Sequence, residues 1–147
     1  MTPRALIADD ERLMREQLRA RLAEVWPELE IAGEAKNGIE AVEMTASLHP
    51  DLVFLDIRMP GMTGVDAARQ IAQLPTDDGW PGCEIVFITA YDQYAVEAFE
   101  QGVVDYVLKP VRDERLSEAV RRVVHRLEGA EPAPAADESI VVELGGV

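Results

Sequence analysis

The sequence is poor in cysteine and aromatic residues, and it contains no long apolar run. Its single cysteine, Cys83, excludes an internal disulfide and suits a reducing compartment. No apolar run approaches the length of a transmembrane helix, and charged residues at positions 4, 9, 10 and 11 interrupt anything that resembles a signal peptide. We therefore expect a cytoplasmic protein without a membrane partner.

Basic residues are also scarce relative to acidic ones, with 14 Lys and Arg against 28 Asp and Glu and a net charge of −14. Residues 128–147 contain five of the acidic residues and none of the basic ones, so residues 1–127 keep 23 acidic and 14 basic residues and carry −9. Contacts to nucleic-acid phosphates need clustered Lys and Arg. This composition argues against direct DNA or RNA binding by these residues.

What the sequence does contain is a regular alternation of strand-like and helix-like stretches. The expected strands are residues 4–8, 30–35, 52–56, 84–89 and 105–108. The expected helices are residues 11–25, 39–48, 63–74, 92–101 and 111–127. Five strand–helix units in alternation predict an α/β fold, a doubly wound five-stranded parallel sheet flanked by five helices.

Two segments stand apart from this pattern. Residues 75–82 are dense in Gly, Pro and Asp, which predicts an exposed loop. Residues 129–137 have the Ala- and Pro-rich composition of a linker, and residues 139–144 have the pattern of a strand without neighbours. We expect one domain over residues 1–127, followed over 128–147 by an acidic Ala/Pro linker and the start of a truncated output domain.

Chemically active side chains follow or end four of the expected strands. Asp9 and Asp10 follow the first strand, Asp56 ends the third, Thr89 ends the fourth and Lys109 follows the fifth. The carboxyl ends of parallel strands share one edge of the sheet, and ligands of open α/β proteins bind there. The sequence therefore predicts one site with three carboxylates, a hydroxyl and an ammonium group.

The chemistry of such a site is phosphoryl transfer with a divalent cation. Three neighbouring carboxylates repel one another unless a cation lies between them, and Mg²⁺ is a hard ion that prefers oxygen ligands. Asp56, opposite the acidic pair, is a candidate nucleophile whose attack on phosphorus gives an aspartyl phosphate. Lys109 would offset charge on the phosphoryl oxygens, and Thr89 would donate its hydroxyl to the new phosphate. A cis peptide at Lys109-Pro110 would suit this role of the ammonium.

Each of these signals has an ordinary explanation when taken alone. Asp9 and Asp10 are compatible with a solvated helix N-terminus. Asp56 is compatible with a strand-end cap, Thr89 with a β-branched strand residue, and Lys109 with a loop residue. Their joint occurrence at four strand ends is what favours a functional site.

Together the motifs resemble the receiver domains of two-component response regulators, which are CheY-like. The resemblance covers residues 4–127 and rests on the acidic pair, on Asp56 ahead of Met-Pro-Gly-Met-Thr-Gly, on Thr89-Ala90 and on Lys109-Pro110. It implies a flavodoxin-like sheet with strand order 2-1-3-4-5. It also implies a phosphorylation-activated switch in which Asp56 accepts a phosphoryl group from a sensor histidine kinase in a Mg²⁺-dependent reaction.

The resemblance assigns roles to further residues. The Mg²⁺ ligands would be Asp10 chiefly, then Asp9, Asp56 and the backbone carbonyl of Arg58. Thr89 would be the switch hydroxyl, and Tyr106 the aromatic residue whose rotamer follows it. From the residues alone, the alternative for Tyr106 is a core aromatic whose hydroxyl lies at the surface.

A finer resemblance runs through residues 87–99 and 105–111, and it points to receivers that carry a C-terminal LytTR-type DNA-binding domain. It implies a transcriptional regulator that contacts DNA only through a domain absent from this sequence, and that forms a homodimer on phosphorylation. The expected partner surface consists of Tyr91, Tyr94, Ala95, Ala98 and Phe99, although about half of such a set must belong to the core.

Two other functions remain open on the residues. A phosphate-independent dimerisation module would not need the complete acid, hydroxyl and lysine set. A phosphatase with an aspartyl phosphate intermediate needs an additional acid or base, and Arg58, Ala90 and Tyr91 are the residues nearest the key positions, none of them a good general base. We therefore expect a protein that is no enzyme beyond its own phosphorylation and slow dephosphorylation.

Overall fold

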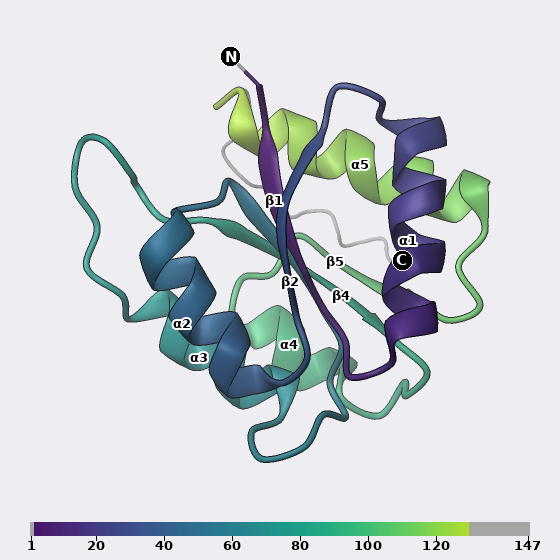
Figure 1. Cartoon of the computed structure of the whole chain (residues 1–147), viewed down its shortest axis with the longest axis horizontal. Coiled ribbons are helices and arrows are strands. Elements are labelled where there is room, and N and C mark those ends of the chain that lie inside the picture. Colours follow the sequence, from purple (N-terminus) through teal and green to yellow (C-terminus); the bar gives the residue numbers. More distant parts are fainter. Residues whose placement is uncertain (1, 130–147) are drawn as a thin grey trace.

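Five parallel strands form one sheet in the order β2-β1-β3-β4-β5, which confirms the predicted topology. The computed structural model describes residues 2–129 (Figure 1). The strands are β1 (Arg4–Ala8), β2 (Glu30–Ala35), β3 (Leu52–Leu55), β4 (Glu84–Thr89) and β5 (Asp105–Leu108). Of the predicted linker and output segment, residues 130–147 lie outside the described residues, so that expectation stays a prediction.

Helices cover both faces of the sheet, α1 and α5 on one side and α2, α3 and α4 on the other (Figure 1). They are α1 (Arg12–Val25), α2 (Gly38–Leu48), α3 (Gly64–Ala72), α4 (Ala95–Glu100) and α5 (Asp113–Leu127). None of the helices within residues 2–129 has both the length and the apolarity that a membrane crossing requires.

The short apolar runs of the sequence are strands buried on both faces. Along β1, Leu6 and Ala8 pack on the side of α2 and α3, whereas Ala5 and Ile7 pack on the side of α1 and α5. All four residues of β3 are at most 1% exposed. Strands with helices on both sides need no polar face, so they are continuous apolar runs rather than alternating patterns.

The largest boundary error concerns α4. The sequence predicts a helix over residues 92–101, but the structure has an irregular turn at 91–94 and a helix of only six residues. Tyr94 is the N-cap residue, with a non-helical φ of −101° and ψ of 4° and no side-chain cap. The N–H of Ala95 reaches back only three residues, to the Asp92 carbonyl at 3.4 Å, so the chain turns there instead of continuing the helix. Similarly, α5 begins at Asp113 rather than at residue 111, because Arg112 is extended.

The predicted exposed loop at residues 75–82 is anchored at one point. Trp80 is only 4% exposed, its indole N–H donates to the Pro50 carbonyl at 2.8 Å, and its ring stacks on His49 with a centroid separation of 4.4 Å. The rest of the loop is exposed or half-buried as expected. The aromatic anchor gives this long connection a fixed position on the end of the sheet away from the aspartates.

Helix α3 begins in close contact with the chain that leaves β3. The backbone N–H of Gly64 donates to the Ile57 carbonyl at 2.8 Å. A Cβ atom at position 64 would lie 2.0 Å from the backbone oxygen of Asp56, so the backbones approach as closely as they do only because residue 64 is glycine.

Gly64→Ala is therefore expected to lower the free energy of unfolding by about 2 kcal/mol or more, because backbone must shift to admit the methyl group. The matched control is Gly79→Ala, whose Cβ would lie 3.4 Å from its nearest neighbour, Asp77 Oδ1, an ordinary van der Waals contact. It should change stability by less than about 0.5 kcal/mol. Urea denaturation followed by fluorescence of Trp26 and Trp80 measures both, and equal stabilities would contradict the packing described.

Candidate functional site

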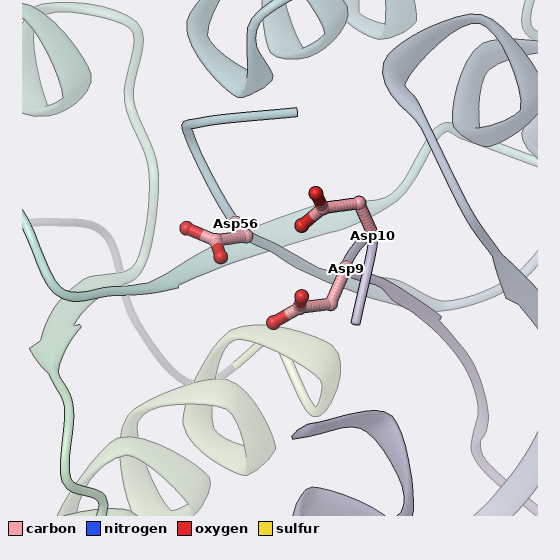
Figure 2. Close-up of side chains that lie close together, drawn as sticks. All are labelled: Asp9, Asp10 and Asp56. Carbon is pink, nitrogen blue, oxygen red and sulfur yellow. The ribbon is translucent and has the colours of Figure 1, made fainter. Parts of the chain in front are cut away.

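Three aspartates meet at the carboxyl edge of the sheet. Figure 2 shows Asp9 and Asp10 at the end of one segment and Asp56 on another. Strands β1 and β3 are paired in parallel, with Ala8 opposite Leu55, so the residues that follow them lie side by side. A carboxylate oxygen of each aspartate lies within 4.8 Å of the others. The structure thus brings together the three acids that the sequence selects.

The three carboxyl groups differ in exposure. Asp9 and Asp56 are 5% and 7% exposed, whereas Asp10 is an exposed residue. Burial raises the pKa of Asp9 and the nearby charge of Asp56 raises it further, against the lowering effect of hydrogen bonds from Lys109 and Glu11. The cluster therefore consists of two buried carboxyl groups and one exposed carboxyl group. Repulsion among their negative charges destabilises it unless a cation is near.

Lys109 reaches this cluster from the chain that follows β5. Its Nζ atom donates to Asp9 Oδ2 at 2.8 Å and to Asp56 Oδ2 at 2.9 Å. Burial alone would lower the pKa of Lys109, but the hydrogen bonds and charges of the two aspartates outweigh burial and raise it. The ammonium is therefore charged and offsets part of the carboxylate charge. The Lys109-Pro110 peptide is cis, as the sequence predicts.

Asp56 is held at three of its polar atoms. Its backbone N–H donates to the Ala8 carbonyl at 2.9 Å, Oδ1 accepts the N–H of Ile57 at 2.6 Å, and Oδ2 accepts from Lys109. One oxygen of the carboxylate is therefore bound by the backbone, and the other is bound by the lysine ammonium. An arrangement of this kind fixes the orientation of a nucleophile while leaving one oxygen exchangeable.

The predicted switch residues are joined through the backbone of Tyr91. Thr89 is fully buried, and its hydroxyl oxygen accepts the N–H of Tyr91 at 3.4 Å. Tyr106 is 8% exposed and donates its hydroxyl to the carbonyl of the same Tyr91. Its ring packs near Phe87 and Phe99, and burial raises its pKa. Tyr106 is thus a core aromatic, and its hydroxyl binds backbone rather than standing free at the surface.

The predicted partner surface is partly core. Tyr91 and Phe99 are 37% and 51% exposed, but Tyr94 and Ala95 are half-buried. Ala98 is fully buried in the cluster between the sheet and α2, α3 and α4, so its place on an exposed surface was a wrong prediction. On a helix this short, the residue that faces the sheet is flanked by residues that face solvent.

The sequence analysis did not assign Val96 and Leu108 to this surface, and it assigned Arg58 to the metal site only. Val96 on α4 is 74% exposed and Leu108 at the end of β5 is 45% exposed, so α4 and β5 present two more exposed apolar side chains besides Phe99. The guanidinium of Arg58 lies 4.6 Å from the ring centroid of Tyr91, a cation–π contact. The predicted metal contact of the Arg58 carbonyl stays a prediction.

Arg15 is a site residue that the sequence analysis missed. It is buried in α1, and its Nη1 atom donates to the backbone carbonyl of Asp9 at 2.7 Å. A signal was present, because Arg15 shares a helix face with Leu18 and Leu22, and a basic residue on an apolar face needs a buried partner.

Comparison with known proteins agrees with this geometry. Residues 5–121 match the family described as the response regulator receiver domain. A response regulatory protein of Vibrio cholerae is 46% identical over 123 residues, which are 84% of this chain and 45% of that protein. The transcriptional regulatory protein BtsR of Escherichia coli is 40% identical over 120 residues, 82% of this chain and 47% of BtsR. The chain spans about half the length of the curated relatives it matches.

Solved structures give the same assignment. The receiver domain of AraT from Geobacillus stearothermophilus has a TM-score of 0.76 at 35% identity and covers 90% of this chain and 100% of its own. The response regulatory domain of mrkE from Klebsiella pneumoniae has a TM-score of 0.76 at 31% identity, with 86% and 98% covered. With its strand order, its three aspartates and its paired lysine, this chain belongs to the family of response regulator receiver domains.

Proposed function

We propose that Asp56 accepts a phosphoryl group from a sensor histidine kinase in a Mg²⁺-dependent reaction, and that this phosphorylation switches the domain on. The observation that carries the proposal is the pair of hydrogen bonds from Lys109 to Asp9 and Asp56. They place a cation and two carboxylates at one point, where a phosphoryl group needs both a nucleophile and charge compensation.

The chemistry of the cluster fits a hard divalent cation. In the described part of the chain, three carboxylates share one ammonium, that of Lys109, which contacts Asp9 and Asp56. One oxygen of each carboxylate lies within 4.8 Å of the others. Asp9, Asp10, Asp56 and the backbone carbonyl of Arg58 would hold the ion. When bound, Mg²⁺ supplies positive charge to the phosphoryl oxygens and helps to orient the donor.

The two oxygens of Asp56 have different parts in the transfer. Oδ1 is occupied by the N–H of Ile57, so Oδ2 is the oxygen that attacks phosphorus. As the Oδ2–P bond forms, the bond from phosphorus to the histidine nitrogen of the kinase breaks, and the nitrogen keeps the electron pair. Lys109 then pairs with a phosphoryl oxygen in place of Oδ2, which offsets the added negative charge.

Thr89 and Tyr106 carry the signal away from Asp56. The hydroxyl of Thr89 holds the N–H of Tyr91 only at 3.4 Å, a weak bond that is given up when Thr89 turns to a phosphoryl oxygen. Tyr106 holds the carbonyl of the same residue, so both contacts act on the turn that precedes α4. A short helix without a side-chain cap is an element that such a local change can shift.

The output follows from the surface beside this turn. We propose that the exposed apolar residues of α4 and β5 form the homodimer surface of the phosphorylated domain. The relatives are about twice as long, and one of them is named a transcriptional regulatory protein. We infer a cytoplasmic regulator that binds DNA only through an additional LytTR-type domain, and that turns over no substrate besides its own phosphoryl group.

Phosphorylation is tested with acetyl phosphate as donor and intact mass as readout. The wild type with Mg²⁺ is expected to gain one phosphoryl group, and chelation of Mg²⁺ with EDTA should abolish the gain. Asp56→Asn should gain none, since an amide is no nucleophile for phosphorus. An equal gain by Asp56→Asn would place the phosphoryl group elsewhere and contradict the proposal.

Lys109→Gln separates cation binding from phosphorylation. Because Lys109 competes for oxygens of Asp9 and Asp56, its removal should tighten Mg²⁺ binding by roughly tenfold or more. The rate of phosphoryl gain should fall, because the charge that offsets the phosphoryl oxygens is lost. Titration calorimetry and mass spectrometry measure the two effects. Lys36→Gln, at the chain's other lysine, is the control, and a similar response there would contradict the role of Lys109.

Dimerisation is tested at Val96. Its side chain is 74% exposed, so a charged residue there should leave the fold intact. Val96→Asp is expected to weaken the dimer formed with beryllofluoride, a mimic of the phosphoryl group, by about tenfold or more. Leu13→Asp on α1 adds the same charge at a residue 61% exposed and should leave the dimer unchanged. Sedimentation velocity measures both variants, and an equal loss of dimer would move the interface elsewhere.

A further inference from the structure

Arg15 is a buried cation inside a helix face that otherwise packs on the core. It is 8% exposed, with Leu18 and Leu22 of the same face buried beside it. A buried guanidinium must find acceptors for its N–H groups and a counter-charge, or its burial is costly. The groups that accept hydrogen bonds from Arg15 therefore indicate which part of the structure Arg15 fixes.

The guanidinium of Arg15 bridges β2 and the loop after β1. Its Nε atom donates to Glu34 Oε1 at 2.9 Å, and its Nη1 atom donates to the Asp9 carbonyl at 2.7 Å. The other oxygen of Glu34 accepts from Arg19 at 2.9 Å. Burial would raise the pKa of Glu34, but the hydrogen bonds and charges of Arg19 and Arg15 outweigh it and lower that pKa. Glu34 is therefore an ionised anchor for Arg15.

The carbonyl that Arg15 holds belongs to the peptide between Asp9 and Asp10. The preceding peptide, between Ala8 and Asp9, is also held. The N–H of Asp9 donates to the Ala35 carbonyl at 3.1 Å, which continues the pairing of β1 with β2. On the other side of Asp10, the N–H of Glu11 donates to Asp9 Oδ1 at 2.9 Å. Because the peptides before and after Asp10 are both held, the first by Arg15, the direction in which the Asp10 side chain leaves the backbone is set.

Asp10 depends on this backbone anchor more than the other two acids do. The carboxylates of Asp9 and Asp56 are each bound by a backbone N–H and by Lys109. Across residues 2–129, the Asp10 carboxylate takes part in no hydrogen bond or ion pair, and it is exposed. Its position relative to Asp9 and Asp56 is consequently controlled through its main chain.

We propose that Arg15, held by Glu34, is a positioning residue that fixes the Asp9–Asp10 peptide and so directs Asp10 to the divalent cation. The inference rests on the proposed Mg²⁺ site. Because Glu34 lies against Arg15 and offsets part of its charge, which it also does for the exposed Arg19, Arg15 repels the incoming ion less than an unpaired guanidinium would. A lone basic side chain at the same place would oppose cation binding.

The test compares Mg²⁺ affinity by titration calorimetry in wild type, Arg15→Gln and Arg19→Gln. Arg15→Gln should bind Mg²⁺ about tenfold more weakly, a change typical of a lost partner of a metal ligand. Arg19→Gln is the matched control, since Arg19 binds Glu34 but is not bonded to Asp9. It should bind within about twofold of wild type.

Thermal unfolding with EDTA and with Mg²⁺ separates positioning from a purely structural role. At a fixed concentration, a ligand that binds the folded state more tightly raises Tm further, so the Mg²⁺-dependent rise reports the site itself. A structural role would lower Tm equally in both conditions and leave the rise unchanged. Positioning predicts a smaller rise for Arg15→Gln at the same Mg²⁺ concentration.

Should Arg15→Gln fail to fold, Arg15→Lys decides the question. An ammonium keeps the charge but lacks the planar fork that reaches Glu34 and the Asp9 carbonyl together, so affinity should fall by about threefold. Wild-type affinity in Arg15→Gln, or in Arg15→Lys where only that variant folds, would overturn the role of Arg15 alone. Failure of the wild type to bind Mg²⁺ would overturn the proposed function and this inference together.

Discussion

Charge balance at one edge of the sheet is the constraint from which the rest of the site follows. Asp9, Asp56 and the nearby Asp10 repel one another. Within residues 2–129, the one ammonium that contacts the cluster belongs to Lys109, which binds Asp9 and Asp56 and lies 100 positions further along the chain than Asp9. The interaction exists only because β1 and β3 are neighbours and β5 ends on the same side of the sheet. One ammonium leaves the cluster under-neutralised, which is why the same oxygens are suited to exchange between lysine, a divalent cation and a phosphoryl group.

The site has a rigid half and a less constrained half. On the rigid side, the aspartates follow β3, which is buried throughout, and β1, which is buried from Ala5 to Ala8. Gly64 brings the start of α3 against the backbone of Asp56. On the other side, Thr89 and Tyr106 bind the backbone of Tyr91, which leads into a short helix with exposed apolar residues. Chemistry that needs fixed geometry thus lies beside an element with few packing constraints, as a switch requires.

Much of this arrangement could be predicted from the sequence, because buried parallel strands leave a local signal. The bounds of β1, β2, β4 and β5 coincide with the predicted ones, and β3 ends one residue early at Leu55. The acids, the hydroxyl and the lysine were recognisable because each follows or ends such a run. What could not be predicted depends on tertiary contacts: the burial of Ala98, the anchoring of Trp80 on Pro50, and the partnership of Arg15 with the Asp9 carbonyl.

We propose that Asp56 is the acid that attacks phosphorus, whereas Asp9 and Asp10 bind the cation. The most direct test of this proposal is to treat the phosphorylated wild type with sodium borohydride, which reduces an acyl phosphate to an alcohol, and to map the product by tandem mass spectrometry. Homoserine is expected at position 56, and intact aspartate at positions 9 and 10. Homoserine at position 9 or 10, with Asp56 unchanged, would contradict it.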